Sequence, residues 1–180
     1  MYKLKSIINC CKKKRKGVYI LQLNNNKYYI GQSEDIDRRI CYHKNYQGSK
    51  WTRTYQVINE IKPNTNKQEN FWELTETLYY MNKYGIENVR GSMFTNIELS
   101  QSDKIMAAQL YCELNNLCRK CGKEGHFINQ CQETNVADWV KNFGGKLDNF
   151  RKCKVCSINI YNLPSYFKYC RPCYSKSLKN

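Results

Sequence analysis

The stretch GVYILQLNNNKYYIGQSEDIDRRICYH, from Gly17 to His43, decides the fold of the first part of the chain. Its segments GVYILQL and KYYIGQ are rich in β-branched and aromatic residues, which favour strands. The three asparagines between them tolerate positive φ angles and therefore favour a tight connection. The stretch predicts an antiparallel hairpin.

A short helix is predicted directly after this hairpin. Ser33 is placed to act as its N-cap, and the two acidic residues that follow complement the helix dipole. Ile36 and Ile40 are four residues apart and form a buried stripe. Arg39 and His43 have the same spacing, so they share a neighbouring face.

Fewer elements are predicted beyond this point. The segments GSKWTR and KPNTNK indicate a loop region, and ENFWELTETLYYMNKYG carries apolar residues at helical spacing, with Gly85 at its end. The segment VRGSMFTNIEL predicts a further strand. The segment SDKIMAAQLYCELNNL predicts a short helix capped by Ser102 or Asp103.

Positive charge is concentrated at the two ends of the chain. Residues 1–16 carry a net charge of +7, residues 17–116 are neutral, and residues 117–180 carry +8. Basic segments on either side of a neutral body indicate a polyanionic partner, and nucleic acid is the commonest one. No apolar run approaches the roughly 20 residues of a membrane span, so no membrane partner is expected.

Seven of the eleven cysteines are clustered at metal-ligand spacing. A secreted disulfide framework would explain the number of cysteines but not their C-x-x-C clustering, so reduced thiols that bind two structural zinc ions are the better interpretation. The first zinc set follows C-x2-C-x4-H-x4-C and comprises Cys118, Cys121, His126 and Cys131. The second follows C-x2-C-x13-C-x2-C and comprises Cys153, Cys156, Cys170 and Cys173.

Two resemblances emerge from these motifs. GVY at Gly17–Tyr19 and YIG at Tyr29–Gly31, followed by DIDRRICYH and an acidic helix, resemble the GIY-YIG nuclease family over roughly residues 16–95. Val18 replaces the usual isoleucine, and Gly85 stands where many members carry a proline. The first zinc set, with its two glycines, resembles the CCHC zinc knuckle. The combination also resembles proteins of large DNA viruses.

The first resemblance implies a catalytic set, which comprises Tyr19, Tyr29, Arg39, His43 and Glu76. Tyr19 is implied as the general base, although an ordinary pKa near 10 makes it a poor base at pH 7 unless nearby cations lower that pKa. Arg39 would stabilise the pentacoordinate phosphorus, and His43 would orient the phosphate or assist a proton transfer.

A carboxylate on the acidic helix would hold one catalytic Mg²⁺ or Mn²⁺. Glu76 lies twelve residues before Asn88 and fits the layout of the family best. Glu73 is the second choice, and Glu69 lies near the same helix face. The choice between these glutamates stays open at the level of sequence.

Knuckles bind single-stranded nucleic acid by stacking bases on exposed rings and pairing cations with phosphates. Phe127 is the expected stacking platform, although Arg119 occupies a position where many knuckles carry an aromatic residue. The expected partner is DNA, single-stranded or branched forms included, and the knuckle admits RNA as well. The expected nucleic-acid contacts are Lys44, Lys50, Arg53, Arg119, Lys123 and Phe127.

The predicted fold class is α+β, a small antiparallel β-sheet flanked by helices and followed by two zinc-stabilised modules. The expected parts are a basic lead (1–16), a GIY-YIG-like domain (17–98), a helical connector (99–117), the knuckle (118–131), a linker (132–152), a four-cysteine zinc-ribbon-like module (153–173) and a basic tail (174–180).

Hydrolysis of DNA phosphodiester bonds by an endonuclease is the leading hypothesis for the function. A non-catalytic, zinc-dependent nucleic-acid-binding protein is the alternative, and a disulfide-bonded secreted protein is a third. The expected location is intracellular, in the cytoplasm or nucleus of an infected host if the protein is viral.

Overall fold

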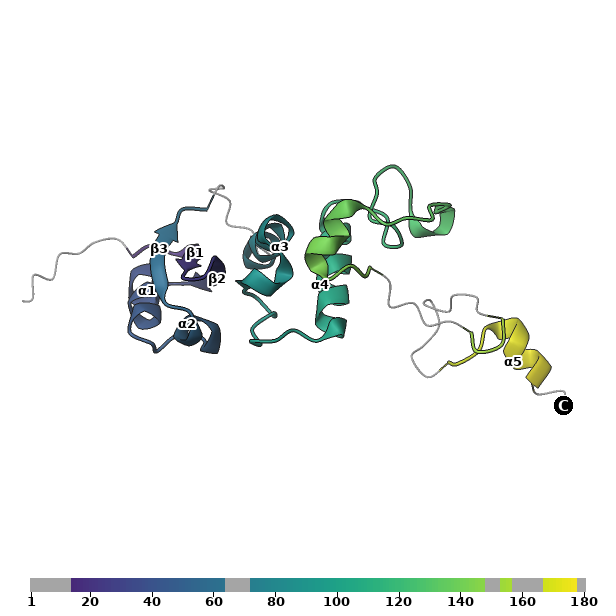
Figure 1. Ribbon diagram of the computed structural model, residues 1–180, viewed down its shortest axis with the longest axis horizontal. Helices are drawn as coiled ribbons and strands as arrows, with labels where there is room; N and C mark the ends of the chain where they lie inside the picture. Colours follow the sequence, from purple (N-terminus) through teal and green to yellow (C-terminus); the bar gives the residue numbers. More distant parts are fainter. Residues whose placement is uncertain (1–13, 64–71, 148–152, 157–166, 178–180) are drawn as a thin grey trace, which may run out of the picture. The chain divides into compact units, whose positions relative to one another are not determined.

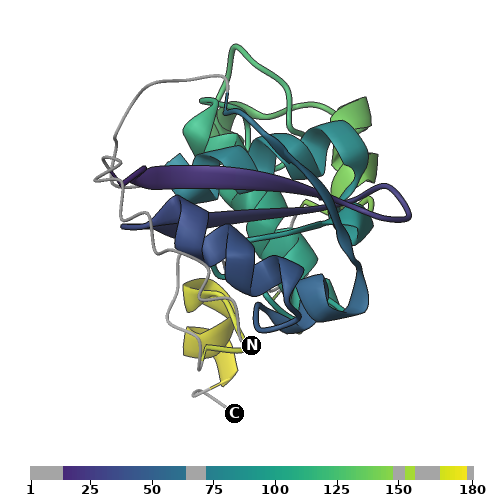
Figure 2. The ribbon, with the colours of Figure 1, turned by 90° about the vertical axis from the view of Figure 1, so that its left-hand side faces the viewer.

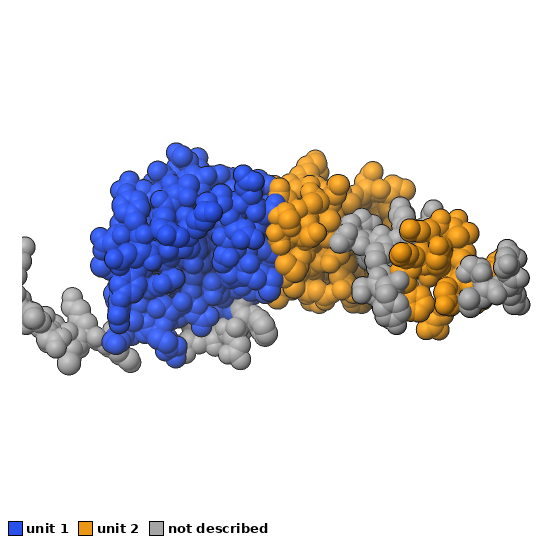
Figure 3. All heavy atoms as spheres, turned by 90° about the horizontal axis from the view of Figure 1, so that it is seen from below, with its two compact units in different colours: residues 1–99 blue, residues 100–180 orange. Residues whose placement is uncertain are grey.

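The computed structural model describes residues 14–63, 72–147, 153–156 and 167–177. The chain divides into two compact units, Met1–Leu99 and Ser100–Asn180 (Figure 3). Most of the basic lead and Glu69 lie outside the described residues. No helix within the described residues is long and apolar enough to cross a membrane.

Unit 1 is built on a four-stranded sheet with the strand order β3-β1-β2-β4. β1 (Gly17–Leu23) and β2 (Lys27–Ser33) form the predicted antiparallel hairpin, and two asparagines of its turn adopt positive φ angles. β3 (Val57–Ile61) is antiparallel to β1, whereas β4 (Val89–Arg90) is parallel to β2. The sheet is therefore mixed rather than purely antiparallel, because a helix connects β3 to β4.

Helices cover both faces of this sheet (Figures 1 and 2). α1 (Ile36–Lys44) and α2 (Lys50–Thr54) cover one face, where Trp51 packs into a buried cluster with alternate residues of β1. α3 (Trp72–Tyr84) covers the other face and is followed by the short helix η1 (Ile86–Asn88). There the ring of Tyr28 stacks on that of Tyr84 with 4.2 Å between centroids.

Several boundaries differ from those predicted. α1 is capped by Asp35, whose side chain accepts from the Arg38 N–H, and not by Ser33, so the helix begins later. α2 and β3 occupy a region that was expected to be a loop. The sequence did not predict them because each has only five residues, too few for a periodic pattern, and is held by tertiary packing.

Unit 2 begins with α4 (Gln101–Leu114), whose N-cap is Ser100 rather than Ser102 or Asp103. Ser100 and Asp103 form a capping box in which each side chain accepts from the backbone N–H of the other residue. The remaining helices of this unit are η2 (Ile128–Gln130), η3 (Asp138–Phe143) and α5 (Arg171–Ser177).

Much of the segment expected to be a linker, residues 132–152, is folded. η3 packs against α4, and the rings of Tyr111, Trp139 and Phe143 contact one another. The indole Nε1–H of Trp139 donates to the Gly122 carbonyl at 2.8 Å. The segment therefore forms an apolar core that joins the knuckle to α4.

A buried arginine fixes the end of unit 1. Arg90 is 1% exposed, and its guanidinium donates to four backbone carbonyls at 2.6 Å each, those of Ile86, Val89, Asn96 and Ile97. The guanidinium also lies 4.3 Å from the centroid of the Trp51 ring. These contacts tie the segment after β4 to the core beneath α2.

Replacing Arg90 with methionine should destabilise unit 1, because it leaves four carbonyls without their charged donor. We expect a loss of about 3 kcal/mol or more in the free energy of unfolding. Urea unfolding followed by tryptophan fluorescence measures it. Arg38→Met, which removes an exposed arginine of α1, is the matched control and should change stability by less than about 1 kcal/mol. Equal effects of the two variants would contradict this role for Arg90.

Candidate active site

The two half-motifs of the hairpin meet at Tyr19 and Gly31, which are direct partners across the β1–β2 ladder. A Cβ atom at position 31 would overlap the Tyr19 hydroxyl oxygen, so only glycine leaves room for the phenol. The Tyr19 ring therefore lies flat across the neighbouring strand on the face that α1 covers.

From this position Tyr19 begins a chain of buried hydrogen bonds. Its Oη lies 2.8 Å from Nε2 of His43, and Nδ1 of His43 lies 2.7 Å from Oγ1 of Thr52. His43 and Thr52 are 1% and 0% exposed. Gly48 is required beside this chain because a Cβ there would overlap His43 Nδ1.

Arg39 and Tyr29 complete the cluster. The ring centroids of Tyr29 and His43 are 4.9 Å apart, and those of Tyr19 and Tyr29 are 6.3 Å apart. Arg39 is placed one helical turn before His43, close enough to both phenols that its interactions with Tyr19 and Tyr29 raise its pKa. The structure thus brings together four of the five predicted catalytic residues.

Burial dominates the ionisation of this cluster. It raises the pKa of Tyr19, and the neighbouring Tyr29 adds to this, while hydrogen bonding to Arg39 acts in the opposite direction. Burial likewise raises the pKa of Tyr29. Burial and the charge of Arg39 lower the pKa of His43 to about 4. At pH 7 both phenols are protonated and the imidazole is neutral.

The two candidate glutamates of α3 lie in different surroundings. Glu73 Oε1 accepts from the Ser92 N–H at 2.9 Å, just past the end of β4, and the charge of Glu73 raises the pKa of both Tyr19 and Tyr29. Glu76 is 8% exposed and accepts from Trp72 Nε1 at 3.2 Å. Its charge acts instead on Tyr80, in the aromatic cluster on the other face of the sheet.

Three residues of the cluster were not identified from the sequence. Thr52 contacts His43 directly, Ser49 caps α2 with its oxygen 3.2 Å from that of Thr52, and Gly48 makes room for the imidazole. All three lie in the segment GSKWT. Ser49 is a residue type that favours the N-cap position, and this is the one signal that could have indicated a short helix there.

Basic residues near the cluster are divided between paired and unpaired positions. The predicted contacts Lys44, Lys50 and Arg53 are exposed on α1 and α2. The described end of the basic lead is partly neutralised by ion pairs: Lys14 with Asp35, Arg15 with Asp37 and Glu60, and Lys16 with Glu34.

Both predicted zinc sets come together in unit 2. The ligand atoms of Cys118, Cys121, His126 and Cys131 all lie within 4.8 Å of one another, and so do those of Cys153, Cys156, Cys170 and Cys173. Four thiolate or imidazole donors at this separation fit a tetrahedral structural zinc ion. All nine described cysteines are free of disulfides, as zinc binding requires.

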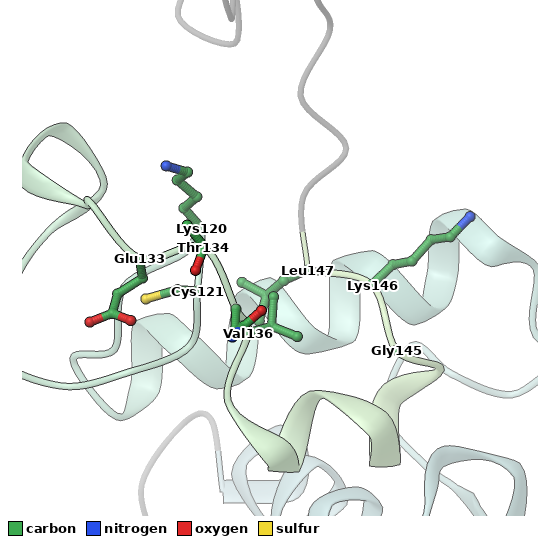
Figure 4. Close-up of a pocket in the computed structure, with 9 residues that line it drawn as sticks. Lys120, Cys121, Glu133, Thr134, Val136, Gly145, Lys146 and Leu147 are labelled. Carbon is green, nitrogen blue, oxygen red and sulfur yellow. The ribbon is translucent and has the colours of Figure 1, made fainter.

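The surface around the knuckle is polar and mostly basic. Arg119 pairs with Glu113 of α4, Lys123 pairs with Glu133, and Phe127 is 68% exposed. A hollow of about 240 Å³ lies between the knuckle and the segment after it (Figure 4). Val136 and Leu147 line its apolar part, while the amino groups of two lysines, Lys120 and Lys146, point outward from it.

The low pKa of His43 makes unit 1 sensitive to acid. An unfolded histidine has a pKa near 6.5, so between pH 6.5 and about 4 the unfolded state binds a proton that the folded state does not. Stability is therefore lost as the pH falls through this window, and from pH 7 to pH 5 the loss from His43 should be about 2 kcal/mol.

Urea unfolding of unit 1 at pH 7 and pH 5 measures this loss. His43→Gln is the control, since glutamine cannot titrate, and the part of the pH dependence due to His43 should disappear in that variant. An unchanged pH dependence would show that other groups carry it.

Zinc should be required for the fold of unit 2, because the knuckle and the η3 segment share one core. We expect two zinc ions per chain by metal analysis and one in Cys131→Ser. Cys41→Ser, an exposed cysteine outside both sets, should keep two. Chelation should also shift the fluorescence of Trp139 to longer wavelength, since it frees the indole from Gly122. A zinc-free protein with unchanged fluorescence would contradict this coupling.

The comparisons with known proteins agree with this geometry. Neither a curated protein nor a solved structure matches the chain significantly. None of these comparisons bears on the expected resemblance to proteins of large DNA viruses. Family models match two parts of the chain: residues 15–85 match the GIY-YIG catalytic domain, and residues 116–133 match the zinc knuckle. The chain therefore combines a region similar to the GIY-YIG catalytic domain with a region similar to the zinc knuckle, followed by a second cysteine cluster.

Proposed function

We propose that this protein is a divalent-metal-dependent endonuclease that hydrolyses phosphodiester bonds in DNA. The observation that carries the proposal is the convergence of Tyr19, Tyr29, Arg39 and His43 on one buried cluster. A guanidinium beside two phenols and a neutral imidazole offers hydrogen-bond donors for a phosphate and a route for a proton. The match of residues 15–85 to the GIY-YIG catalytic domain supports the same chemistry.

Tyr19 and His43 supply the route for the proton. Water attacks phosphorus and gives its proton to the Tyr19 oxygen, while the phenolic proton passes to His43 Nε2, 2.8 Å away. The P–O bond to the leaving group breaks as the new P–O bond forms, and the leaving oxygen departs as an alkoxide that takes a proton from solvent water. This relay spares Tyr19 from becoming a free phenolate, which its raised pKa disfavours.

Arg39 and Tyr29 bind the phosphate. The guanidinium, whose charge acts on both phenols, donates charge-assisted hydrogen bonds to the oxygens of the pentacoordinate phosphorus. Because these donors are held by α1 and β2, they need little rearrangement when the substrate binds.

Glu73 is proposed as the residue that holds the catalytic metal ion. A carboxylate is a hard oxygen donor that suits Mg²⁺ or Mn²⁺, and the charge of Glu73 reaches both active-site phenols, whereas that of Glu76 acts on Tyr80. When bound, such an ion neutralises charge on the scissile phosphate and the leaving oxygen. The Ser92 N–H fixes the orientation of the carboxylate.

The zinc modules are proposed to hold the nucleic acid. Phe127 offers an exposed ring for base stacking, and the basic side chains on unit 2 offer charge for phosphates. The knuckle match supports this assignment. A knuckle of this kind can bind either nucleic acid, so a binding measurement with DNA and RNA oligonucleotides decides between them.

Nicking of supercoiled plasmid in the presence of Mg²⁺ or Mn²⁺ tests the proposal. Tyr19→Phe and Arg39→Ala should each reduce the nicking rate by about 100-fold, because they remove the proton route and the phosphate donor. Glu73→Gln should do the same, while Glu76→Gln should stay within about threefold of wild type.

Two results would contradict parts of this scheme. Loss of nicking in Glu76→Gln but not in Glu73→Gln would assign the metal to Glu76. A wild-type protein that leaves plasmid intact with either metal, but still retards oligonucleotides in a gel, would favour the non-catalytic binding protein.

A further inference from the structure

Thr52 lies at the inner end of the hydrogen-bond chain that begins at Tyr19, on the side of His43 away from the phenol. It is completely buried and belongs to α2. Its hydroxyl oxygen lies 2.7 Å from His43 Nδ1 and 3.1 Å from the Ser49 carbonyl.

The hydrogen positions in this chain follow from which atoms can donate. The Ser49 carbonyl can only accept, so the single hydroxyl proton of Thr52 is the one that can complete that contact. The Ser49 hydroxyl, 3.2 Å from the Thr52 oxygen, is then the donor in the contact between the two hydroxyls. The Thr52 oxygen is then an acceptor toward His43, and the proton between them belongs to Nδ1.

A neutral imidazole with its proton on Nδ1 has a lone pair on Nε2, which faces Tyr19. The Tyr19 hydroxyl therefore donates to Nε2. Its oxygen keeps lone pairs that can face the positive charge of Arg39, which acts on Tyr19. This assignment makes every contact of the chain a hydrogen bond at the same time, whereas the opposite tautomer leaves the contact from Thr52 to Ser49 without a proton.

We propose that Thr52 is a positioning residue that fixes the tautomer of His43, so that Nε2 can accept the proton of Tyr19. The expected effect on the cleavage rate rests on the proposed nuclease function. The tautomer of His43 does not, because it is a property of the folded protein alone.

Nuclear magnetic resonance of the zinc-loaded full chain with ¹⁵N-labelled histidine measures the tautomer directly. The chain has two histidines, His43 and His126. His126 belongs to the knuckle, so its signals serve as an internal reference. We expect couplings that assign the proton of His43 to Nδ1 at pH 7. A proton on Nε2 in the wild-type protein would overturn the proposal without any variant.

Thr52→Val keeps the shape of the side chain and removes the hydroxyl. We expect it to move the His43 proton wholly or partly to Nε2 and to lower the single-turnover nicking rate by about tenfold, with DNA affinity unchanged. Thr52→Ser restores a hydroxyl and should recover both the tautomer and most of the rate. Thr54→Val is the matched control, since Thr54 lies on the same helix and donates only to the Lys50 carbonyl.

Each of three results would overturn the proposal. The tautomer of His43 could be unchanged in Thr52→Val, Thr52→Ser could behave like Thr52→Val, or Thr54→Val could lose as much of the nicking rate as Thr52→Val. If the wild-type protein does not cleave DNA, the proposed function fails. The tautomers of the wild type and of the Thr52 variants would still decide whether Thr52 sets the proton on His43.

Discussion

The close approach of Tyr19 to Gly31 is the constraint on which unit 1 depends. The phenol can lie across the neighbouring strand only because position 31 has no side chain, and from there it reaches His43 on α1. In this position Tyr19 also interacts with Arg39 on the same helix, which raises the pKa of the guanidinium. Strand pairing, helix packing and the candidate chemistry thus share a single contact.

The hairpin, α1 and both zinc sets could be predicted because their signals are local. Turn residues, the four-residue spacing of Arg39 and His43, and the spacing of the cysteines all lie within short segments. α2 and β3 gave no such signal, since five residues show too little periodicity. Their place depends on Trp51, whose partners lie on β1, β2 and α1.

The choice between Glu73 and Glu76 shows a different limit. Both residues lie on α3, and sequence spacing gave Glu76 the better fit. Their surroundings differ because β4 ends beside Glu73, where the Ser92 N–H orients its carboxylate, whereas Glu76 faces an aromatic cluster. Neither the parallel pairing of β4 nor the contact with Ser92 leaves a periodic pattern in the sequence. The contact between Thr52 and His43 could not be predicted for the same reason: it is a tertiary contact, which depends on how α2 packs against α1.

In unit 2 the ligands of the knuckle and the apolar contacts between η3 and α4 belong to one folded body. Trp139 covers Gly122 so closely that a Cβ there would lie 2.8 Å from the indole. A fragment cut at the outer cysteines of the knuckle would keep the Gly122 carbonyl but lose Trp139, which both covers Gly122 and donates its indole proton to that carbonyl. The contacts that surround the knuckle extend from α4, which begins at the cap Ser100, to Leu147, well beyond both ends of the motif itself. Excision or transplantation of this motif must respect those longer limits.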